Sequence, residues 1–578
     1  MISSLPFAAL AHYAVDWQLP PAVFFFAGAI VVGVLRGRAQ AAVALLVPLV
    51  GIPNLLGLTA ATVYDVEFFT YTLEFLRVDR LSLLFGLLFH IAALIGVIYA
   101  IHVRDTVQQV AALAYAGSAL GAVFAGDLIS LFISWELLAV TSVFLVWARR
   151  TEQAAGAGLR YLIIQVFSGV LLLAGALIRL HETGTTSFDY IGLEGLAAWL
   201  IFIAFGIKCA FPFLHNWLTD AYPESTPTGT VFLSAFTTKV AVYALARGYP
   251  GTELLIYIGA VMTAFPIFYA VIENDLRRVL GYSMINQIGF MVVGIGIGTS
   301  LAMNGAVSHA FNDVIFKGLL FMSMGAVLHM TGKINGSELG GLYKTMPITT
   351  TLCIVGAASI SAFPLFSGFV SKSMVMLALL QDDRPIIWLV MLFASAGVFH
   401  HAGIKIPYFA FYAHDSGIRT REPPWNMLLA MGIAATLCIF NGSYPHLLYS
   451  ILPFPVDYVP YTASHVLTQT QLLFFSALAF AWLNLVGLYP PELKSINIDA
   501  EWFYRRLAPQ SIQAIVVWID HTGGLLKQDA KAQLKDFVDG VTRHHGPEGA
   551  MARTWPTGAT VLWVAILLGA FLIASFLP

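Results

Sequence analysis

The sequence predicts an all-α membrane protein that crosses the bilayer many times, and three observations lead to this prediction. Of the 578 residues, 58% are hydrophobic and 11% are charged, and the mean hydropathy is +0.79. Apolar runs of about 20 residues recur almost end to end, and each is long enough to cross a hydrocarbon core of about 30 Å as a helix. The runs are too uniformly apolar for the alternating strands of a barrel, so we expect about sixteen transmembrane helices.

The expected helices follow one another along the whole chain. Their predicted starts lie near residues 21, 40, 81, 107, 128, 158, 196, 228, 252, 279, 303, 347, 385, 425, 468 and 556. Basic residues gather on every second loop: Arg36, Arg38, Arg104, Arg149, Arg150, Arg277, Arg278, Lys333, Lys344, Arg419 and Arg421. The pattern survives its exceptions, which are Arg77, Arg80, Arg179, Arg247 and Arg384. The positive-inside rule therefore predicts a bacterial inner-membrane protein with its N-terminus outside and these loops in the cytoplasm.

Composition and motifs exclude several classes of function. A net charge of -2 gives no basic field for nucleic acid. Cys209, Cys353 and Cys438 lie singly in apolar runs, without the spacing that a metal, haem or iron–sulfur cluster needs, so we interpret them as small core residues. The chain has no nucleotide loop or flavin motif, and we expect no cofactor. The first residues lack a basic n-region, so we expect no cleaved signal peptide.

Two of the predicted spans contain residues that interrupt a helix. The span from 347 to about 381 is too long for one straight crossing and contains the segment FPLFSGF, residues 363–369. The span from 196 to 217 contains Pro212, four residues after Lys208. Both predict broken helices at mid-membrane, where free carbonyls and half-helix dipoles can solvate an ion.

Four charged residues lie at membrane depth within apolar runs: Glu136, Lys208, Lys239 and Lys317. A charge at the bilayer centre costs about 3 kcal/mol or more, so four of them indicate pairing, hydration or function. Lysine suits proton transfer because burial lowers its pKa toward neutrality and a nearby carboxylate raises it again. The alternative is a static ion pair between Glu136 and Lys208, although buried pairs stabilise proteins poorly.

One predicted helix carries three titratable residues in register. His309, Asp313 and Lys317 recur at i, i+4 and i+8, so they share one helical face. This spacing predicts a polar path for protons along the helix, because three titratable groups in register are hard to explain as packing.

Several segments together resemble the antiporter-like subunits shared by Mrp-type cation/proton antiporters, respiratory complex I and membrane-bound hydrogenases. They are GDLISLFISWELL, IKCAFPFLHNWLTDAYPESTPTGTVFLSAFTTKVAVYALAR, ENDLRRVLGYSMINQIGFM, HAFNDVIFKGLLF, ELGGLYKTMP and FPLFSGFVSK, within residues 75–415. The resemblance implies two inverted five-helix repeats. It also implies that Glu136 pairs with Lys208, that Lys239, His309 and Lys317 relay protons, and that Lys372 is the terminal gate.

The resemblance also suggests a division of the chain and a particular member of the family. We expect N-terminal helices in 1–106, an antiporter-like core in 107–415 with repeats 107–250 and 251–415, further helices in 416–490, and a final helix in 556–578. Residues 491–555 mix apolar and charged residues and predict a cytoplasmic amphipathic or lateral segment, with a disordered linker as the alternative. Lysine at both 239 and 372 resembles the D-type subunit of Mrp antiporters. Asp313 stands where some relatives have histidine.

Lys405 is a further candidate on grounds of spacing. The separation of Lys372 from Lys405 is similar to that of Lys208 from Lys239, so we interpret Lys405 as the symmetry counterpart of Lys239. The alternative is a lysine near a helix end that snorkels to the membrane surface.

These observations leave three functions open. The first is a proton-translocating subunit of a multisubunit Na+/H+ antiporter, which is a transporter and not an enzyme. The second is a proton-pumping membrane subunit of a complex I-like NADH:quinone oxidoreductase or a membrane-bound hydrogenase, and the third is a membrane subunit of an inorganic-carbon uptake complex. Each requires other membrane subunits as partners, besides protons and a monovalent cation in the first case.

Overall fold

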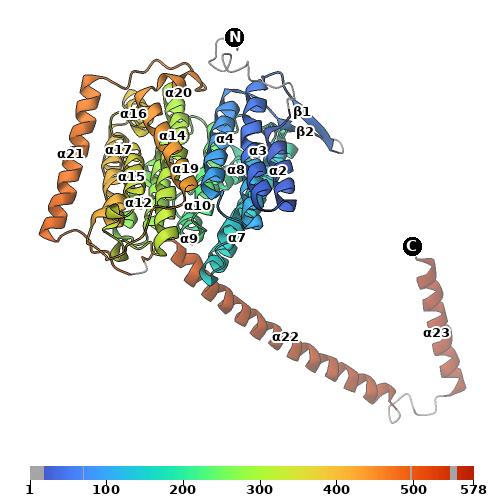
Figure 1. Cartoon of the computed structure of the whole chain (residues 1–578). Helices are drawn as coiled ribbons and strands as arrows, with labels where there is room; N and C mark the ends of the chain where they lie inside the picture. Colours follow the sequence, from blue (N-terminus) through green and yellow to red (C-terminus); the bar gives the residue numbers. More distant parts are fainter. Residues whose placement is uncertain (1–18, 69–70, 495–496, 547–555, 578) are drawn as a thin grey trace. The chain divides into compact units, whose positions relative to one another are not determined.

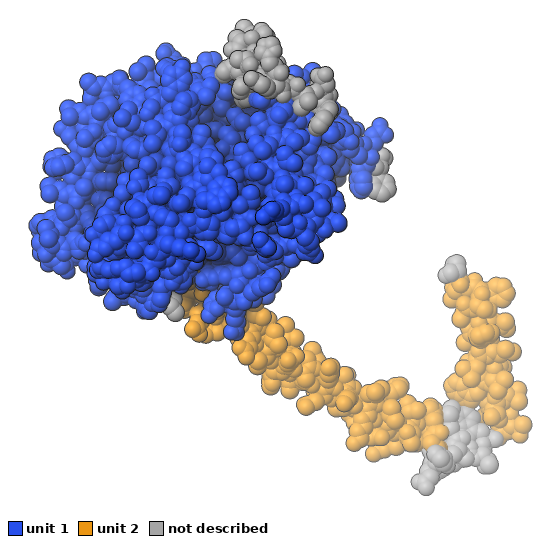
Figure 2. All heavy atoms as spheres, in the orientation of Figure 1, with its two compact units in different colours: residues 1–497 blue, residues 498–578 orange. Residues whose placement is uncertain are grey.

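The computed structural model describes residues 19–68, 71–494, 497–546 and 556–577. These residues form two compact units, residues 1–497 and residues 498–578 (Figure 2). Unit 1 is a helical bundle with one β-hairpin, and the described residues of unit 2 form helices.

The elements of unit 1 follow the predicted spans. Its helices are α2 (Pro21–Val34), α3 (Gly37–Gly57), α4 (Arg80–Ala100), α5 (Thr106–Phe124), α6 (Leu128–Trp147), α7 (Glu152–Thr183), α8 (Gly195–Lys208), α9 (Asn216–Glu224), α10 (Gly229–Ala235), α11 (Thr237–Gly248), α12 (Glu253–Ile272), α13 (Leu276–Ile297), α14 (Ser300–Thr331), α15 (Pro347–Ile360), α16 (Ser367–Gln381), α17 (Pro385–Val398), α18 (Lys405–Pro407), α19 (Trp425–Ser443), α20 (His446–Ser450) and α21 (Ala463–Val486). Short 3-10 turns, η2 (Gly336–Glu338) and η3 (Leu342–Lys344), and π-helical turns, η4 (Phe399–Ile404) and η5 (Tyr408–Tyr412), complete the helical segments.

The all-α membrane class is confirmed. Within the described residues, 13 helices are long and apolar enough to cross a membrane, and four shorter apolar helices (α2, α8, α15 and α16) accompany them. A helix begins at or near each of the sixteen predicted starts, although the 13 long helices do not fix the number of crossings at sixteen. The chain is therefore a multi-pass membrane protein.

The centre of unit 1 is formed by α13 and α14 (Figure 1). Almost every residue of α13 is buried, as is every residue of α14 from Ala302 to Val327. Helix α14 contacts α10, α13, α15, α16 and α19, so protein surrounds it on all sides. By contrast, α21 stands at the edge of the bundle with few buried residues (Figure 1). Charged side chains on α14 are therefore shielded from lipid.

Capping residues reveal an internal repeat. The same three caps occur twice, 148 residues apart: an aspartate at the start of α6 and α13 (127 and 275), a threonine at the start of α7 and α14 (151 and 299), and a left-handed glycine at their ends (184 and 332). Helices α7 and α14 both have 32 residues. Helix α6 begins beside the hairpin, where Asp127 accepts from the Glu74 amide, whereas α13 begins beside the end of α9, which lies at the other end of the bundle (Figure 1). This is the inverted relationship that the resemblance implies.

Both predicted helix breaks are observed. The chain leaves helical geometry between α8 and α9 and again between α15 and α16. Ala210 and Phe213 in the first break, and Ala362 and Leu365 in the second, adopt positive φ, which side chains other than glycine rarely do. The two breaks lie 152 residues apart and share the segment Ala-Phe-Pro. The break is therefore part of the repeated unit.

Three features of unit 1 were not predicted from the sequence. The helix near 228 is interrupted at Phe236, between α10 and α11, and the span after Pro385 contains the π-helical turns η4 and η5. The segments 64–68 and 71–76 pair as antiparallel strands β1 (Tyr64–Phe68) and β2 (Tyr71–Leu76). Strand β2 is joined to the bundle where the Glu74 amide donates to the Asp127 carboxylate at 2.8 Å.

Arg277 is not a loop charge, as the basic-loop pattern had suggested. It lies in the first turn of α13 and is fully buried. Its guanidinium donates to the carbonyls of Pro223 at 3.0 Å and Ser225 at 3.1 Å, at the end of α9. The charge therefore holds the end of the broken helix in place and contributes nothing to the surface of the loop.

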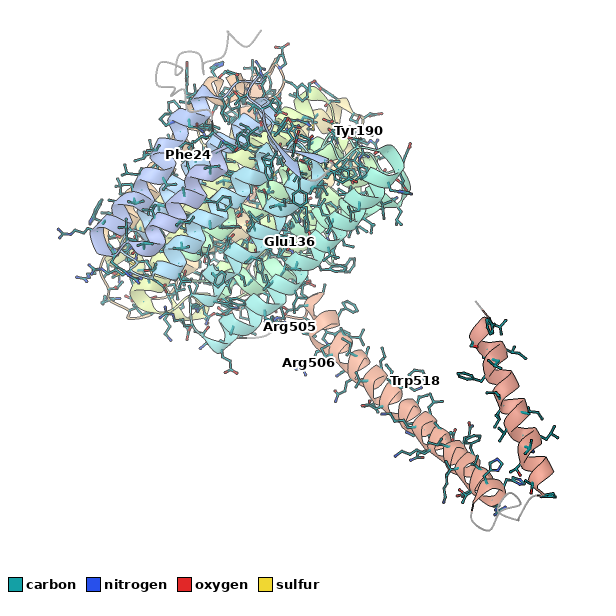
Figure 3. The ribbon with its side chains drawn as sticks, turned by 90° about the vertical axis from the view of Figure 1, so that its right-hand side faces the viewer. Phe24, Glu136, Tyr190, Arg505, Arg506 and Trp518 are labelled. Carbon is teal, nitrogen blue, oxygen red and sulfur yellow. The ribbon has the colours of Figure 1, made fainter. Side chains whose placement is uncertain are left out.

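Unit 2 contains η6 (Phe503–Leu507), α22 (Ala508–His545) and α23 (Thr557–Phe576). Helix α22 has 38 residues, and none of its side chains is buried; Figure 3 shows Trp518 projecting from it. The helix occupies residues 508–545 of the segment 491–555. Helix α23 is apolar and long enough to span a membrane. The role of α22 as a lateral segment stays a prediction.

Candidate functional site

The predicted lysines and their neighbours are enclosed in the bundle. Side chains with 0% exposure are Lys208, Lys239, His309, Asp313, Lys317 and Lys405, and Lys372 is 3% exposed. Glu136 is partly buried, midway along α6 (Figure 3). Glu136 and the lysines 208, 239, 317 and 372, with His309 and Asp313, are called the buried row below. Helix α14 is buried all round, so contacts and not burial show which way each of its side chains points.

Lys208 ends α8, directly before the first break. Its ammonium donates to the Trp135 carbonyl at 2.5 Å and lies 4.7 Å from the centre of the Trp135 ring. Glu136 follows Trp135 on α6 and interacts electrostatically with Lys208. No ion pair between the two is found in the described part of the chain, and the Glu136 Oε1 atom is buried without a hydrogen-bond partner. The alternative of a static ion pair between Glu136 and Lys208 is therefore not formed in this structure.

The absence of a side chain at Gly169 makes room for the Glu136 carboxylate. A Cβ atom built on Gly169, in the middle of α7, would collide with Glu136 Oε1. The neighbouring Ser168 hydroxyl accepts from the Trp135 indole at 2.9 Å and donates to the Ala204 carbonyl at 2.7 Å. The α6–α7 contact thus holds the backbone beside Glu136, and Gly169 leaves the space that the carboxylate occupies.

Lys239 and Asp313 form the one ion pair within the buried row that the described residues show. The distance from Lys239 Nζ to Asp313 Oδ2 is 2.6 Å, and both side chains are 0% exposed. Lys239 also donates to the Ser234 carbonyl at 3.3 Å, which the break between α10 and α11 leaves free. Asp313 Oδ1 has no hydrogen-bond partner. This pair links the first repeat to α14 of the second.

His309 lies one turn before Asp313 and joins three helices. Its Nδ1 is 3.1 Å from the Ser371 hydroxyl on α16, and its Nε2 is 3.2 Å from Gln287 Oε1 on α13. Gln287 in turn donates to Asn286 at 2.6 Å. The Gln287 Oε1 atom can only accept, so this contact favours a proton on Nε2, whereas the Ser371 hydroxyl can donate to Nδ1 or accept from it.

Lys317 and Lys372 both make neutral contacts. Lys317 donates to the Ser283 hydroxyl at 2.7 Å on α13. Lys372 donates to the Ile360 carbonyl, at the end of α15, at 3.2 Å and lies 4.9 Å from the centre of the Phe290 ring. The charge of Asp313 acts on both lysines. A single carboxylate thus faces three lysines and one histidine, so a proton on one of these groups disfavours a proton on the next.

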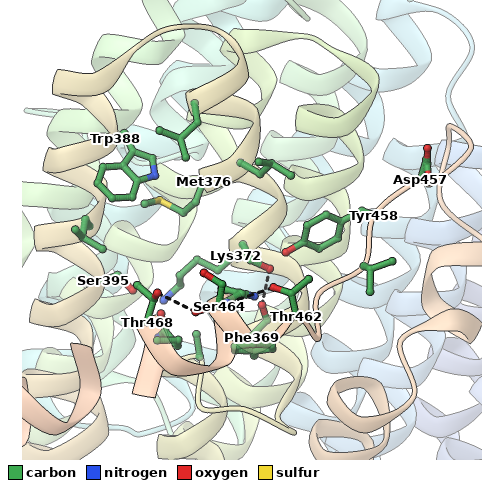
Figure 4. A pocket seen from close by; sticks show the side chains of 18 residues that line it. Phe369, Lys372, Met376, Trp388, Ser395, Asp457, Tyr458, Thr462, Ser464 and Thr468 are labelled. Atoms are coloured by element: carbon green, nitrogen blue, oxygen red, sulfur yellow. Dashed lines mark hydrogen bonds between the residues drawn. The ribbon is translucent and has the colours of Figure 1, made fainter. Parts of the chain in front are cut away.

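A cavity of about 580 Å³ opens beside Lys372 (Figure 4). One wall is apolar and includes Met376 and Trp388, whereas the facing wall carries the hydroxyl groups of Ser464 and Thr468 on α21. The loop at 457–459 also lines it. Lys372 is therefore the member of the buried row that borders a space large enough for water and lined in part by polar groups.

Lys405 lies apart from the buried row. The caps place the position equivalent to Lys239 at 387 and the break places it at 391, whereas Lys405 lies further along the chain. Its interpretation as the symmetry counterpart of Lys239 stays a prediction. The snorkelling alternative is wrong, because the ammonium is fully buried and pairs with Glu492 Oε1 at 2.9 Å.

Sequence reasoning missed the polar residues that connect the lysines. Ser283, Asn286 and Gln287 on α13 were present in a quoted motif, and their polar character within an apolar helix was the available signal. His401 was also overlooked, although it lies four residues before Lys405 and so shares a helical face with it. In the described ranges no group of three or more His, Cys, Asp or Glu residues could hold a metal ion. The three cysteines are buried singly, as predicted.

Known proteins provide an independent comparison. Residues 125–399 match the family model described as "NADH:quinone oxidoreductase/Mrp antiporter, TM". The chain is 31% identical over 429 residues to the A-type subunit of the Na+/H+ antiporter of Alkalihalophilus pseudofirmus, which covers 65% of this chain and 53% of that protein. It is 30% identical over 292 residues to the D-type subunit of the same organism, covering 47% of this chain and 59% of that protein. The chain thus spans little more than half the length of these relatives.

Solved structures share the fold. One chain of the Mrp complex from Dietzia sp. superposes with a TM-score of 0.67 and 20% identity, covering 76% of this chain and 96% of that one. A chain of the archaeal membrane-bound sulfane sulfur reductase superposes with a TM-score of 0.69 and 22% identity, covering 96% and 100%. The relatives include both A-type and D-type antiporter subunits, so the likeness to the D type in particular stays a prediction. Together the matches support placing the core of the chain, residues 125–399, in the antiporter-like family of Mrp and complex I membrane subunits.

Proposed function

We propose that the chain is a proton-translocating membrane subunit of a multisubunit monovalent cation/proton antiporter. It would act as a transporter in the bacterial inner membrane, with its N-terminus outside, and would assemble with other membrane subunits. The relatives named as Na+/H+ antiporter subunits support this assignment. The chain's own residues support it through the buried row.

The observation that carries the proposal is the buried ion pair between Lys239 and Asp313. Replacing a buried ion pair by apolar residues is often neutral or stabilising, so packing alone does not explain it. The pair also stands between Lys208 in the first repeat and His309, Lys317 and Lys372 in the second. It therefore lies where a proton path through both repeats would cross from one to the other.

Transfer follows from the imbalance of charge along the row. Asp313 compensates one ammonium, and it contacts Lys239 in this structure. A proton that arrives at Lys208 repels the proton on Lys239 and favours its movement toward Lys317 or His309. Movement of the unpartnered Glu136 carboxylate toward Lys208 would favour the reverse. Water beside Lys372, in the cavity, would then exchange a proton with one side of the membrane.

A redox-driven pump is the second candidate. The chain of the sulfane sulfur reductase, which is described as an archaeal respiratory membrane complex, shares the fold over nearly the whole of this chain. In that case the buried row would move protons without a cation gradient. The two candidate functions share the buried row and differ in the driving force, which is a cation gradient in the first and a redox reaction in the second. The inorganic-carbon complex stays an alternative that no contact in the structure favours.

The test is cation-dependent proton flux in everted membrane vesicles that contain the full chain and its native partner subunits. Addition of Na+, K+ or Li+ to energised vesicles should dissipate the pH gradient. The variant Lys239→Ala should lower this cation-dependent proton flux at least about tenfold. Lys333→Ala is the matched control, because Lys333 is exposed and pairs with Glu338 at the surface. Flux that responds to an electron donor and not to any cation would favour the second candidate. Normal flux in assembled Lys239→Ala vesicles would contradict both.

A further inference from the structure

A fully buried histidine outside the buried row has no hydrogen-bond partner. His401 lies in the π-helical turn η4 and is 0% exposed. The Gly397 carbonyl is near the ring, but neither ring nitrogen makes a hydrogen bond of normal geometry. A buried polar group without a partner costs about 1–3 kcal/mol. Because π-helical turns are rare and gather at functional sites, this arrangement calls for a functional explanation.

The surroundings of His401 connect two parts of the structure. The charged or titratable groups that act on its ring are Lys317 on α14, its neighbour His400, and Lys405 one helical turn later. Turn η4 contacts α12, α13, α15, α17 and α21. It also packs against Ser361, in the break between α15 and α16, where only a residue without a side chain fits at position 403. His401 thus lies on the segment that carries Lys405, and its ring interacts electrostatically with Lys317 on α14.

Lys405 leads from this point to one end of the bundle. Its ammonium donates to the carbonyls of Val271 at 2.6 Å and Glu273 at 2.7 Å, where α12 ends, and pairs with Glu492. The Glu492 side chain is 6% exposed and follows α21 in the sequence. Burial raises the pKa of the Glu492 carboxyl, against the opposing effect of Lys405. A second carboxylate, Glu273, accepts from Asn497 at 3.1 Å at the same end.

We propose that His401, Lys405 and Glu492 form a branch of the proton path, which connects Lys317 with the end of the bundle where α12 ends. This proposal rests on the proposed function and names the residues that would exchange protons with the predicted cytoplasmic side. The cavity beside Lys372 is bordered by the start of α21, whereas Lys405 contacts the segment beyond the end of α21, so the two lysines face different parts of the bundle.

Each step on the branch conserves the proton. The Lys317 ammonium transfers a proton to an unprotonated ring nitrogen of His401, which leaves an amine and an imidazolium. The Lys405 ammonium passes its proton to the Glu492 carboxylate, which releases it to water. The imidazolium then restores the proton on Lys405, and the transfers run backward when protons enter. Unpartnered ring nitrogens suit this role, because no fixed hydrogen bond must be broken first.

The first test replaces His401 by glutamine, which keeps a polar side chain but does not titrate. We expect His401→Gln to lower cation-dependent proton flux at least about tenfold in the assembled complex. His400→Gln is the matched control, because the His400 ring packs against Phe480 and Tyr489 outside the branch. The control should keep normal flux. Equal flux in wild type and both variants would overturn the branch, as would an equal loss in both variants.

A second variant separates transport from packing. In proteoliposomes with the pH set independently on each side, Glu492→Gln should change how flux depends on the pH at the α12 end and leave the dependence on the other side unchanged. A purely structural role would lower flux at every pH on both sides, which would overturn the proposal. The variant Lys317→Met distinguishes a failure of the branch from a failure of the proposed function. Lost flux in that variant with normal flux in His401→Gln refutes the branch alone, whereas normal flux in Lys317→Met refutes the proposed function.

Discussion

The two helix breaks hold their lysines in similar chemical surroundings but on opposite sides of the break. Lys208 precedes its break and donates a hydrogen bond to the Trp135 carbonyl on another helix. Lys372 follows its break and donates a hydrogen bond to the Ile360 carbonyl, which the break itself leaves free. Each ammonium also lies within 5 Å of an aromatic ring centre, at 4.7 and 4.9 Å. Both lysines therefore lie beside a backbone carbonyl and an aromatic ring, although one lysine precedes its helix break and the other follows it.

The difference between the two sites lies in their openness and their acids. Lys208 is enclosed and interacts electrostatically with Glu136, whereas Lys372 borders the cavity and interacts electrostatically with Asp313. Between them, Lys239 and Asp313 are held in contact. The comparison indicates that protons enter and leave at the two ends of the buried row. The ion pair at the centre determines the order of the transfers. The following predictions test this division.

Breaking the central pair should have the largest effect. Asp313→Ala leaves the Lys239 ammonium buried and unpaired, so we expect a loss of about 3–5 kcal/mol in the free energy of unfolding together with loss of proton flux. Thermal unfolding of the purified complex and flux in everted vesicles measure the two effects. The double variant Lys239→Met, Asp313→Leu should recover stability without recovering flux. Recovery of both would show that the pair serves only packing.

Removing the acid or the lysine at the first break should stop transport with little effect on stability. Glu136→Gln and Lys208→Met remove groups that form no ion pair in this structure, so the assembled complex should unfold near the wild-type temperature. Flux should fall at least about tenfold, because the first transfer step is lost. Normal transport in both assembled variants would make the pair structural.

Lys372 should tolerate a change of charge better than its removal. Lys372→Glu keeps a titratable group beside the cavity, so weak flux with an altered pH optimum is expected, whereas Lys372→Ala should stop transport. The pH profile of flux in vesicles separates the two. Wild-type flux in Lys372→Ala would show that protons leave by another route.

The smallest effect should come from the space beside Glu136. Gly169→Ala would force the carboxylate to shift and should reduce flux by a few fold without loss of assembly. Gly432→Ala, in α19, is the control, since an added Cβ meets no atom there. A similar decrease in both variants would attribute the effect to the helix and not to Glu136.

The fold could be predicted from apolar runs because a bilayer forces each of them to satisfy its own hydrogen bonds. Proline and glycine located the breaks near 212 and 364 for the same local reason. The break at Phe236 has no such residue pattern, because packing against neighbouring helices determines it, whereas the π-helical turn at 399–404 contains Gly403, which was not recognised as a signal. The strands of the hairpin also escaped prediction, since they are short segments between long apolar runs.

The individual charged residues were also foreseeable, but their partners were not. Lys239 and Asp313 are far apart in sequence and lie on helices that meet only in the fold. The spacing argument for Lys405 stays a prediction, because similar numbers of residues need not place side chains at equal depth once a helix is broken. Glu492 was beyond prediction altogether, since its burial depends on the return of the chain after α21.

The most direct test of the account is the cation-dependent proton flux of Lys317→Met, normalised to the amount of assembled chain in everted vesicles. Lys317 is buried at the centre of α14 and donates only to Ser283 within the described residues, so its removal breaks no ion pair. Ser283→Ala controls for the lost hydrogen bond. The account predicts that Lys317→Met lowers flux at least about tenfold while Ser283→Ala retains most of it. Wild-type flux in Lys317→Met would contradict the claim that protons cross this membrane through the buried row.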